Sequence, residues 1–181
     1  VEPMILVEES TVPVRPGDTL REHTEKSLRV AVRHWPFDIV ANPEFPQEGS
    51  AVADCRRPDR IIIGCEREEV REVMRDLYAP FNRNHDRIIF MDLRSAELTK
   101  YAANCMLATK ISFINQIAEL AEHLGADIEA VRLGIGADSR IGYHFIYPGC
   151  GYGGSCFPKD MRALIHSAKQ ANCSSDLLEA V

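Results

Sequence analysis

One cysteine lies where a reactive thiol is expected. Cys156 stands between a glycine-rich segment, 149–154, and Pro158, and residues 159–171 contain neither proline nor glycine. Because proline suits the first position of a helix, a helix is predicted to begin at about Pro158. Cys156 would then face the positive end of the helix dipole, with Lys159 close by, and both favour a nucleophilic thiolate. The alternative is a cysteine that serves only as a small buried apolar side chain.

The glycines before this cysteine imitate a dinucleotide-binding fingerprint. Gly149, Gly151 and Gly154 fit the spacing G-x-G-x-x-G, and Asp176 supplies an acid downstream. That fingerprint needs a strand that leads directly into a helix, whereas Pro148 precedes these glycines and further residues separate them from the predicted helix. We therefore reject the fingerprint and expect the glycines to let the backbone approach a ligand or another segment closely.

A long uninterrupted helix is predicted from Ser95 to Leu124. This stretch has no proline or glycine, and its apolar residues recur near helical spacing up to Gly125, which would end the helix. A helix of about 30 residues is roughly 45 Å long and must bury one face, most simply against a partner subunit. Lys100 and Asn104 lie one turn apart on one face, as part of a site or as a solvated stripe.

The first 94 residues alternate short apolar runs with helical patterns. The strand-like runs are 4–7, 38–41, 60–63 and 88–91, and the helical patterns are 20–33 and 66–77. Such alternation predicts an α/β fold built from parallel βαβ units. Ligands of a doubly wound sheet bind beyond the carboxyl ends of its strands, and Thr11 and Glu44 follow two of these runs. The alternative is that both belong to ordinary turns.

The composition is that of a compact globular protein. Apolar residues make up 45% of the chain and charged residues 27%, with a formal net charge of −6. This balance is not that of a nucleic-acid-binding protein, and no apolar run approaches the length of a membrane span. The six cysteines form no Cys-x-x-Cys pair and the histidines are scattered, so we expect no metal site and reduced thiols in a cytoplasmic protein.

Several motifs carry a family resemblance. They are STVPV at 10–14, NPEF at 42–45, EGS at 48–50, PDRIIIG at 58–64, SAELTKYAAN at 95–104, SRIG at 139–142 and GSCFPKD at 154–160. In these segments, and in their order, the chain resembles the UDP-glucose/GDP-mannose dehydrogenase family over nearly its whole length.

The resemblance implies a domain organisation. Residues 1–94 would be the C-terminal part of a Rossmann-like NAD-binding domain, the second half of a doubly wound parallel sheet. Residues 95–181 would be an all-α central domain that carries the cysteine loop and forms a homodimer through the helix from Ser95 to Leu124. The glycine-rich N-terminal half of the NAD-binding domain and a C-terminal UDP-binding domain would lie outside the chain.

The resemblance also implies an activity, the NAD-dependent four-electron oxidation of UDP-glucose to UDP-glucuronate. Cys156 would hold the sugar first as a thiohemiacetal and then as a thioester, chemistry that suits a thiolate. Lys100 and Asn104 would face the sugar and the catalytic water, and Lys100 would stabilise an oxyanion. Either Glu44 or Asp160 would be the base; the alternative for Asp160 is a first-turn acid favoured by the helix dipole.

Further residues are assigned to ligands by the same resemblance. Thr11, Glu48 and Lys159 would contact NAD. The nucleotide sugar would be held by Glu44, Lys100, Asn104, Arg140, Phe145, Ile146, Tyr147, Pro148, Gly149 and Gly153. Arg140 would reach the neighbouring subunit's site, where its planar guanidinium suits a phosphate, unless it is simply a surface arginine.

Some positions depart from the family pattern. Pro46 and Gln47 fill places where a leucine and often a charged residue are expected, Cys55 replaces a large apolar residue, and Glu9 replaces a common lysine. Two alternatives therefore accompany the main hypothesis. One is a sister enzyme acting on GDP-mannose or UDP-N-acetylmannosamine, although the segment 140–148 favours UDP-glucose. The other is a dimerisation core that is inactive in isolation.

Overall fold

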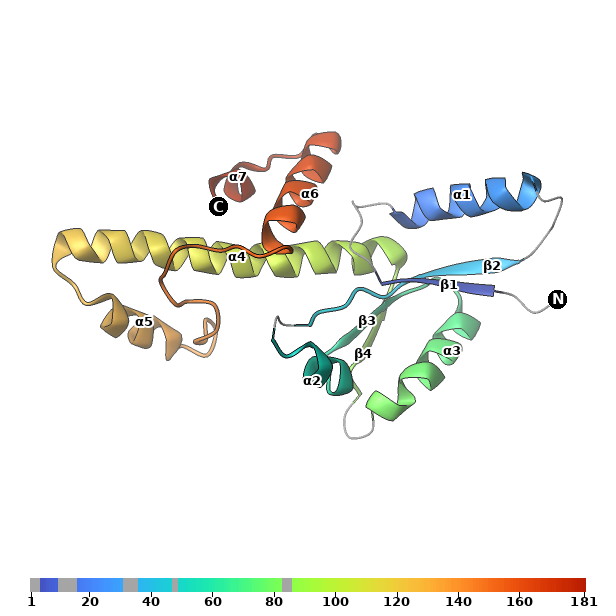
Figure 1. The fold of residues 1–181 in the computed structure, drawn as a ribbon, viewed down its shortest axis with the longest axis horizontal. Coiled ribbons are helices and arrows are strands. Elements are labelled where there is room, and N and C mark those ends of the chain that lie inside the picture. The colour runs from blue at the N-terminus through green and yellow to red at the C-terminus, as the bar shows by residue number, and fades with distance from the viewer. Residues whose placement is uncertain (1–3, 10–15, 31–35, 47–48, 83–85) are drawn as a thin grey trace. The chain divides into compact units, whose positions relative to one another are not determined.

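The computed structural model describes residues 4–9, 16–30, 36–46, 49–82 and 86–181, so Thr11, Gln47 and Glu48 lie outside the described residues. These residues form two compact units, Val1–Lys100 and Tyr101–Val181 (Figure 1). The division falls within a helix that continues from one unit into the other. The predicted domain boundary after residue 94 stays a prediction. Each unit is described by itself.

The first unit is built on a four-stranded sheet with the order β1-β2-β3-β4. The strands are β1 (Met4–Glu8), β2 (Phe37–Ala41), β3 (Ile61–Gly64) and β4 (Ile88–Met91). β1 and β2 are parallel, as are β3 and β4. The predicted α/β class and its mainly parallel sheet are therefore confirmed.

The two strand pairs nevertheless run in opposite directions. β2 and β3 are antiparallel and meet only at their carboxyl ends, where Ala41 pairs with Gly64. The buried side chain of Asn42 contributes to this arrangement, because its Nδ2 donates to the backbone oxygen of Ile62 at 2.9 Å. The alternation of strands and helices had predicted parallel units throughout, and it could not show this reversal.

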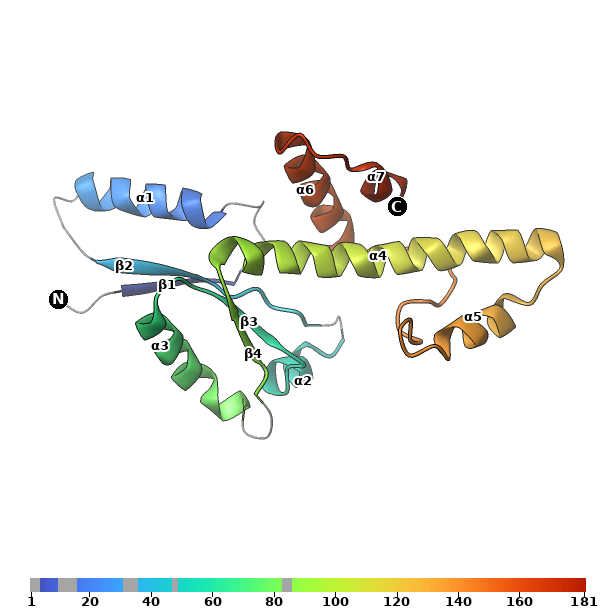
Figure 2. The same ribbon diagram turned by 180° about the vertical axis from the view of Figure 1, so that it is seen from behind.

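Helices cover the sheet of the first unit. These are α1 (Pro16–Val30), α2 (Ala51–Arg56) and α3 (Glu68–Tyr78), followed by the 3-10 turn Ala79–Phe81. α1 and α3 lie on opposite sides of the sheet (Figures 1 and 2). The core joins α3 to the strands, because Val70 and Met74, one turn apart, pack against Val40, Ile61 and Ile63.

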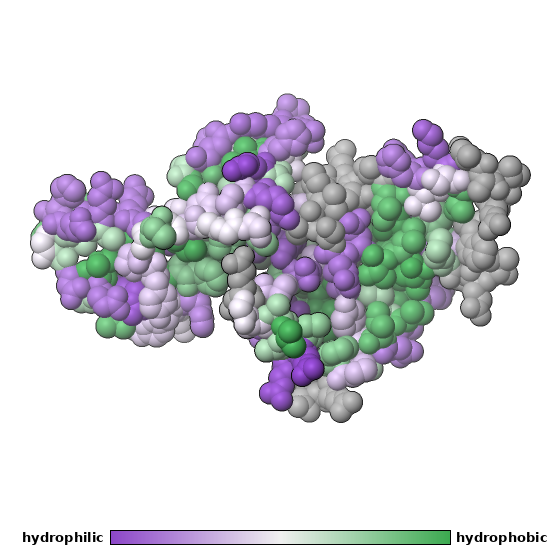
Figure 3. Space-filling model, in the orientation of Figure 1, coloured by the Kyte–Doolittle hydropathy of each residue, from purple (hydrophilic) through white to green (hydrophobic). Residues whose placement is uncertain are grey.

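The sheet ends in an exposed apolar strand. Met4 and Val7 of β1 are 39% and 40% exposed, and apolar residues gather over β1 and β2 in Figure 3. β1 is the outer strand of the sheet on this side among the described residues. An apolar outer strand presents unpaired backbone groups that can accept a further strand. Among the described residues, no helix has the length and apolarity needed to cross a bilayer.

The rest of the chain contains four helices joined by loops. α4 (Leu93–Leu124) is followed by α5 (Ile128–Gly136), α6 (Phe157–Gln170) and α7 (Asp176–Ala180). In the second unit, Cys105 and Ala108 of α4 pack against Met161 of α6. The partly buried rings of Tyr152 and Phe157 complete this cluster.

The long helix agrees closely with its prediction. It begins two residues early, at Leu93, because the Asp92 carboxylate accepts hydrogen bonds from the Ser95 backbone N–H at 2.9 Å and from its hydroxyl at 2.6 Å. It ends at the predicted glycine, since Gly125 has a φ of 70° and Ala126 N–H donates back to Ala121 O at 2.9 Å. The predicted helix near Pro158 is also confirmed, beginning one residue earlier at Phe157.

Candidate functional site

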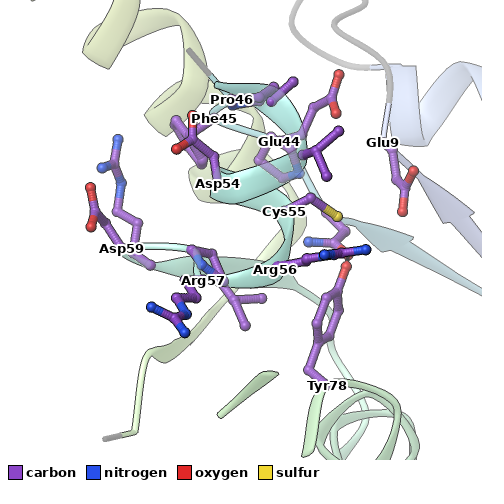
Figure 4. A pocket seen from close by; sticks show the side chains of 17 residues that line it. Glu9, Glu44, Phe45, Pro46, Asp54, Cys55, Arg56, Arg57, Asp59 and Tyr78 are labelled. Carbon is purple, nitrogen blue, oxygen red and sulfur yellow. Dashed lines mark hydrogen bonds between the residues drawn. The ribbon is translucent and has the colours of Figure 1, made fainter. Parts of the chain in front are cut away.

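A cavity of about 520 Å³ opens at the carboxyl end of β2 (Figure 4). Its walls come from the segments 42–46 and 51–61, together with Glu9 and Tyr78. The Tyr78 hydroxyl donates to Asn42 Oδ1, and burial, followed by the charge of Glu9, raises the pKa of Tyr78. The side chains of Cys55, Arg56 and Tyr78 converge in Figure 4. A volume in this range suits a small ligand.

Glu44 lies on the loop after β2, and its backbone is fixed from α4. The Lys100 ammonium, whose residue is 8% exposed, donates to the backbone oxygen of Glu44 and lies 5.0 Å from the ring centroid of Phe45. The Arg60 guanidinium lies 4.1 Å from the same ring centroid. The Glu44 residue is exposed. The loop is therefore held by its main chain and by Phe45, while the carboxylate faces outward.

Cys156 occupies the N-cap position of α6 and is exposed. Its carbonyl accepts the first helical hydrogen bond, from Asp160 N–H at 2.9 Å, and its sulfur lies 3.7 Å from Ser155 Oγ. The alternative of a buried cysteine is thereby excluded for Cys156. The thiol stands in front of the helix terminus, where the unpaired N–H groups and the dipole favour negative charge.

Asp160 sits on the first turn of α6 and is entirely buried. Its Oδ2 accepts a 2.6 Å hydrogen bond from Nδ2 of Asn104, itself only 8% exposed. Its Oδ1 has no hydrogen-bond partner among the described residues, and the Lys159 ammonium lies 3.6 Å from it. A buried carboxylate oxygen without a donor is unfavourable, so this atom is suited to a water molecule or a ligand group.

The buried cysteines differ sharply from Cys156. Burial, followed by the charge of Asp160, raises the pKa of Cys105 to about 11. Burial also raises the pKa of Cys65. Since the thiolate is the nucleophile, neither of these thiols is suited to covalent chemistry near neutral pH. The six cysteines, all of which are described, form no disulfide.

The loop 145–149 is built tightly onto the second unit. Ile146 is 2% exposed, and Gly149 N–H donates to Asn115 Oδ1 at 2.9 Å. Phe145 has a φ of 63°, an uncommon conformation for a bulky residue, and its ring packs edge to face on Phe157 at 6.2 Å between centroids. Because Phe157 directly follows the cysteine, the packing of Phe145 on Phe157 connects this loop to the residue next to Cys156.

Other predicted site residues lie at the surface. The Arg140 side chain is 86% exposed and pairs with Asp138, to which its Nη2 donates at 2.6 Å. The Lys159 side chain is 51% exposed, and Pro148 is partly buried. Gly153 is exposed. Among the described residues, no three side chains are grouped so that they could hold a metal ion.

The predicted catalytic residues fall into two groups. Glu44 and Lys100 belong to the first unit, whereas Asn104, Cys156 and Asp160 belong to the second. α4 carries one member of each group, Lys100 and Asn104, four residues apart. The structure thus brings together Glu44 with Lys100, and Asn104 with Asp160 next to the cysteine turn.

Both parts of the chain match domain models of one family. Residues 94–181 match the UDP-glucose/GDP-mannose dehydrogenase family, central domain, and residues 1–82 match the NAD binding domain of the same family. The chain belongs to the UDP-glucose/GDP-mannose dehydrogenase family. The predicted resemblance is confirmed, and the first unit belongs to a Rossmann-type NAD-binding domain.

Individual members of this dehydrogenase family are similar over nearly the whole chain. The UDP-glucose 6-dehydrogenase of Pseudomonas aeruginosa is 54% identical over 98% of this chain, and UDP-glucose 6-dehydrogenase TuaD of Bacillus subtilis is 45% identical over 98%. A UDP-glucose dehydrogenase structure from Pyrobaculum islandicum has a TM-score of 0.89 at 37% identity and covers 98% of this chain. The chain spans only 39%, 37% and 40% of these proteins, respectively.

Sequence reasoning missed three residues that shape the site. Asn42 and Tyr78 hold the end of β2, and Asn115 holds Gly149. No local pattern singles out Asn115, because other polar residues, such as Ser112 and Gln116, lie close to it in the same helical stretch. The partnership of Asn42 with Tyr78 joins residues that are 36 positions apart, and no local pattern in the sequence indicates it.

Proposed function

We propose that this chain carries the catalytic cysteine and its supporting residues in the NAD-dependent oxidation of UDP-glucose to UDP-glucuronate. One observation carries the proposal. An exposed thiol, Cys156, stands at the N-terminus of α6, and one turn later the buried Asp160 is held by Asn104. A nucleophile beside a positioned carboxylate is the pair needed to form a thioester and then hydrolyse it.

In the proposed reaction Cys156 acts on the C6 aldehyde of the sugar. The sulfur adds to the carbonyl carbon, and the resulting thiohemiacetal becomes a thioester when its carbon loses hydride. NAD, when bound, supplies the acceptor for this hydride and for the hydride that the C6 alcohol loses earlier. The Lys100 ammonium and the Asn104 amide are hydrogen-bond donors that would stabilise the oxyanion.

The last step is hydrolysis of the thioester. Water adds to the thioester carbon, the carbon–sulfur bond breaks, and Cys156 leaves as the thiolate. The base is Glu44 or Asp160. The open Oδ1 of Asp160 supports a role in accepting a proton from a buried water, and the exposed carboxylate of Glu44 supports a role in contacting a ligand.

For NAD, the residues proposed by resemblance are Thr11, Glu48 and Lys159. The described member of this set fits the group, because Lys159 presents a half-exposed ammonium on the first turn of α6, where an anionic ligand is favoured. The cofactor's phosphates are such anions. Lys159 would therefore bind and orient the cofactor without taking part in bond making.

We also propose a homodimer through α4. Met106, Phe113 and Leu120 recur every seven residues along this helix and are 62%, 51% and 52% exposed. An exposed apolar stripe of this kind favours packing against a second helix. The extended Arg140 side chain would then be free to reach the site of the partner subunit, with its Asp138 pairing exchanged for a phosphate. Sedimentation of the chain at micromolar concentration as a folded monomer would contradict the dimer.

The covalent role of Cys156 can be tested by protection from alkylation. The 6-aldehyde of UDP-glucose should slow iodoacetamide labelling of Cys156 by about tenfold or more, while the exposed Cys173 keeps its rate. The aldehydes of GDP-mannose and of UDP-N-acetylmannosamine serve as comparisons for the two sister activities. Equal labelling of Cys156 with and without the UDP-glucose aldehyde would contradict the proposed covalent step.

A further inference from the structure

An arginine is buried on α5, where a short amphipathic helix would ordinarily bury an aliphatic side chain. The Arg132 side chain is only 8% exposed, and its Nε donates to both carboxylate oxygens of Glu129, at 2.8 and 2.9 Å. Its Nη1 is buried and has no hydrogen-bond partner among the described residues. Burying an unpaired donor is unfavourable, so the arginine needs a compensating role at this position.

The compensating contact is with Tyr147. The guanidinium carbon of Arg132 lies 4.2 Å from the centroid of the Tyr147 ring, well within the range of a cation–π interaction. Tyr147 is 60% exposed, so little else covers its ring. Glu129 fixes the plane of the guanidinium through its paired hydrogen bonds. A lysine could not replace this arrangement, because a point charge cannot pair side-on with a carboxylate and lie flat on a ring.

Tyr147 lies in the middle of a loop that is under conformational strain. Phe145 takes a left-handed φ of 63°, which is unfavourable for a bulky side chain and persists only when its surroundings enforce it. The enforcing contacts lie on both sides, with Phe157 against Phe145 and Asn115 bound to Gly149. The contact between Arg132 and Tyr147 falls between these two anchors.

We propose that Arg132 is a positioning residue that holds Tyr147 and thereby fixes the loop 145–149 in the conformation that receives a nucleoside diphosphate sugar. The identity of the ligand rests on the proposed function, whereas the holding of the loop does not. Arg132 acts through the Tyr147 ring and touches no reacting atom. Its removal loosens the loop and, through Phe145 and Phe157, the turn that carries Cys156.

Hydrogen exchange of the loop amides tests the holding without any ligand. Arg132→Met should speed exchange of the Gly149 amide by about tenfold or more, and Tyr147→Ala should do the same. Combining the two changes should add little, because both remove one contact. Tyr147→Phe keeps the ring but loses the hydroxyl, which also interacts with Arg132, so its exchange should fall between those of the original chain and Tyr147→Ala. Arg162→Met controls for the loss of an exposed arginine in the same unit.

Two results would overturn the positioning role. One is a Gly149 amide that exchanges within about twofold of its original rate in Arg132→Met. The other is equal loosening of α5 and the loop in that variant without any effect of Tyr147→Ala, because packing of the helix alone would explain it. Arg132→Lys should behave like Arg132→Met, and an unchanged loop in Arg132→Lys would also contradict the planar contact.

Calorimetric titration with UDP-glucose separates this inference from the proposed function. Arg132→Met should weaken UDP-glucose binding by about tenfold and leave NAD binding unchanged, and Arg162→Met should bind like the original chain. Equal affinity of Arg132→Met and the original chain for UDP-glucose would overturn the inference alone. An original chain that binds no UDP-glucose would count against the proposed function, and the exchange experiment would still decide the role of Arg132.

Discussion

Glu44 and Asp160 are both proposed as the base of one reaction, yet the two regions around them are built in opposite ways. On the loop after β2, Lys100 binds the main chain of Glu44 and leaves its carboxylate exposed. On the first turn of α6, the carboxylate itself is held, because Asn104 binds Asp160 at full burial. The Glu44 carboxylate can therefore be replaced without disturbing the fold, whereas the Asp160 carboxylate is part of the buried interior.

The largest expected effect concerns how well the Asp160 region excludes water. Cys105 packs beside Met161 in this region, and burial and the Asp160 charge raise its pKa to about 11. At about pH 8 iodoacetamide should therefore label the exposed Cys156 at least about 100-fold faster than Cys105. Peptide mass spectrometry measures both rates in one sample, with Cys150 as an exposed reference. Comparable rates for Cys105 and Cys156 would mean that this region opens readily to solvent.

The same thiol predicts a dependence of stability on pH. The folded pKa of Cys105, about 11, lies above its ordinary value of 9.0, so the folded state keeps a proton that the unfolded chain releases. The resulting stability is fully present below about pH 9 and is lost as the pH rises through 11. The loss amounts to at most about 2.7 kcal/mol, from a difference of about two pK units.

Urea unfolding at about pH 8 and at pH 11 measures this loss in the original chain and in Cys105→Ala. Lysines, tyrosines and the buried Cys65 titrate in both proteins, so their contributions cancel in the comparison. The substituted chain is expected to be less stable at low pH, because it loses packing, and to lose less stability at high pH. Parallel pH profiles for the two proteins would show that Cys105 is not protected from ionisation by the fold.

Substitutions of the two carboxylates compare the regions directly. Asn104→Ala removes the hydrogen bond that Nδ2 of Asn104 donates to the buried Asp160 carboxylate and should lower the free energy of unfolding by about 1.5–3 kcal/mol. Asp160→Asn can keep a hydrogen bond to Asn104 and serves as the matched variant with a smaller loss. Glu44→Gln should stay within about 0.5 kcal/mol of the original chain. If Glu44→Gln and Asn104→Ala lowered the free energy of unfolding equally, the proposed difference between an exposed and a buried carboxylate would be wrong.

The sequence predicted those elements whose signals are local. The long helix follows from an unbroken apolar periodicity that ends at Gly125, and all four strands were placed to within one residue of their observed ends. α5 was missed because its sequence, IEAVRLGIG, contains two glycines and reads as a loop. Position 136 of this helix requires glycine, because a Cβ there would lie 2.4 Å from the Tyr143 ring. This contact exists only after folding, so the sequence alone does not indicate it. α2 was missed because six residues are too few for a periodic signal.

In the candidate site, too, some features have local signals in the sequence and others depend on tertiary contacts. Cys156 before a proline, and Asp160 on the first turn, could be placed from sequence because helix starts have local signatures. The complete burial of Asp160 and its bond to Asn104 join residues 56 positions apart, and no local pattern shows them. The antiparallel meeting of β2 and β3 likewise depends on Asn42 reaching Ile62 across the sheet. Tertiary contacts decide these features.

A small loss of stability is expected when the loop that carries Glu44 loses its bond to α4. Lys100→Met keeps the side-chain stem but removes the hydrogen bond to the Glu44 carbonyl and the charge 5.0 Å from the Phe45 ring. The expected loss of stability is about 1 kcal/mol, because the Glu44 carbonyl, which is only partly buried, loses its donor while the apolar stem still packs. The free energy of opening measured by exchange of the Glu44 and Phe45 amides should fall by a similar amount, whereas exchange around Asp160 should not change. Lys100→Arg keeps the charge and should restore most of the protection of Phe45 through its own cation–π contact. If Lys100→Met loosened Asp160 as much as Glu44, the two regions would respond as one, and their contrasting construction would not separate the roles of the two carboxylates.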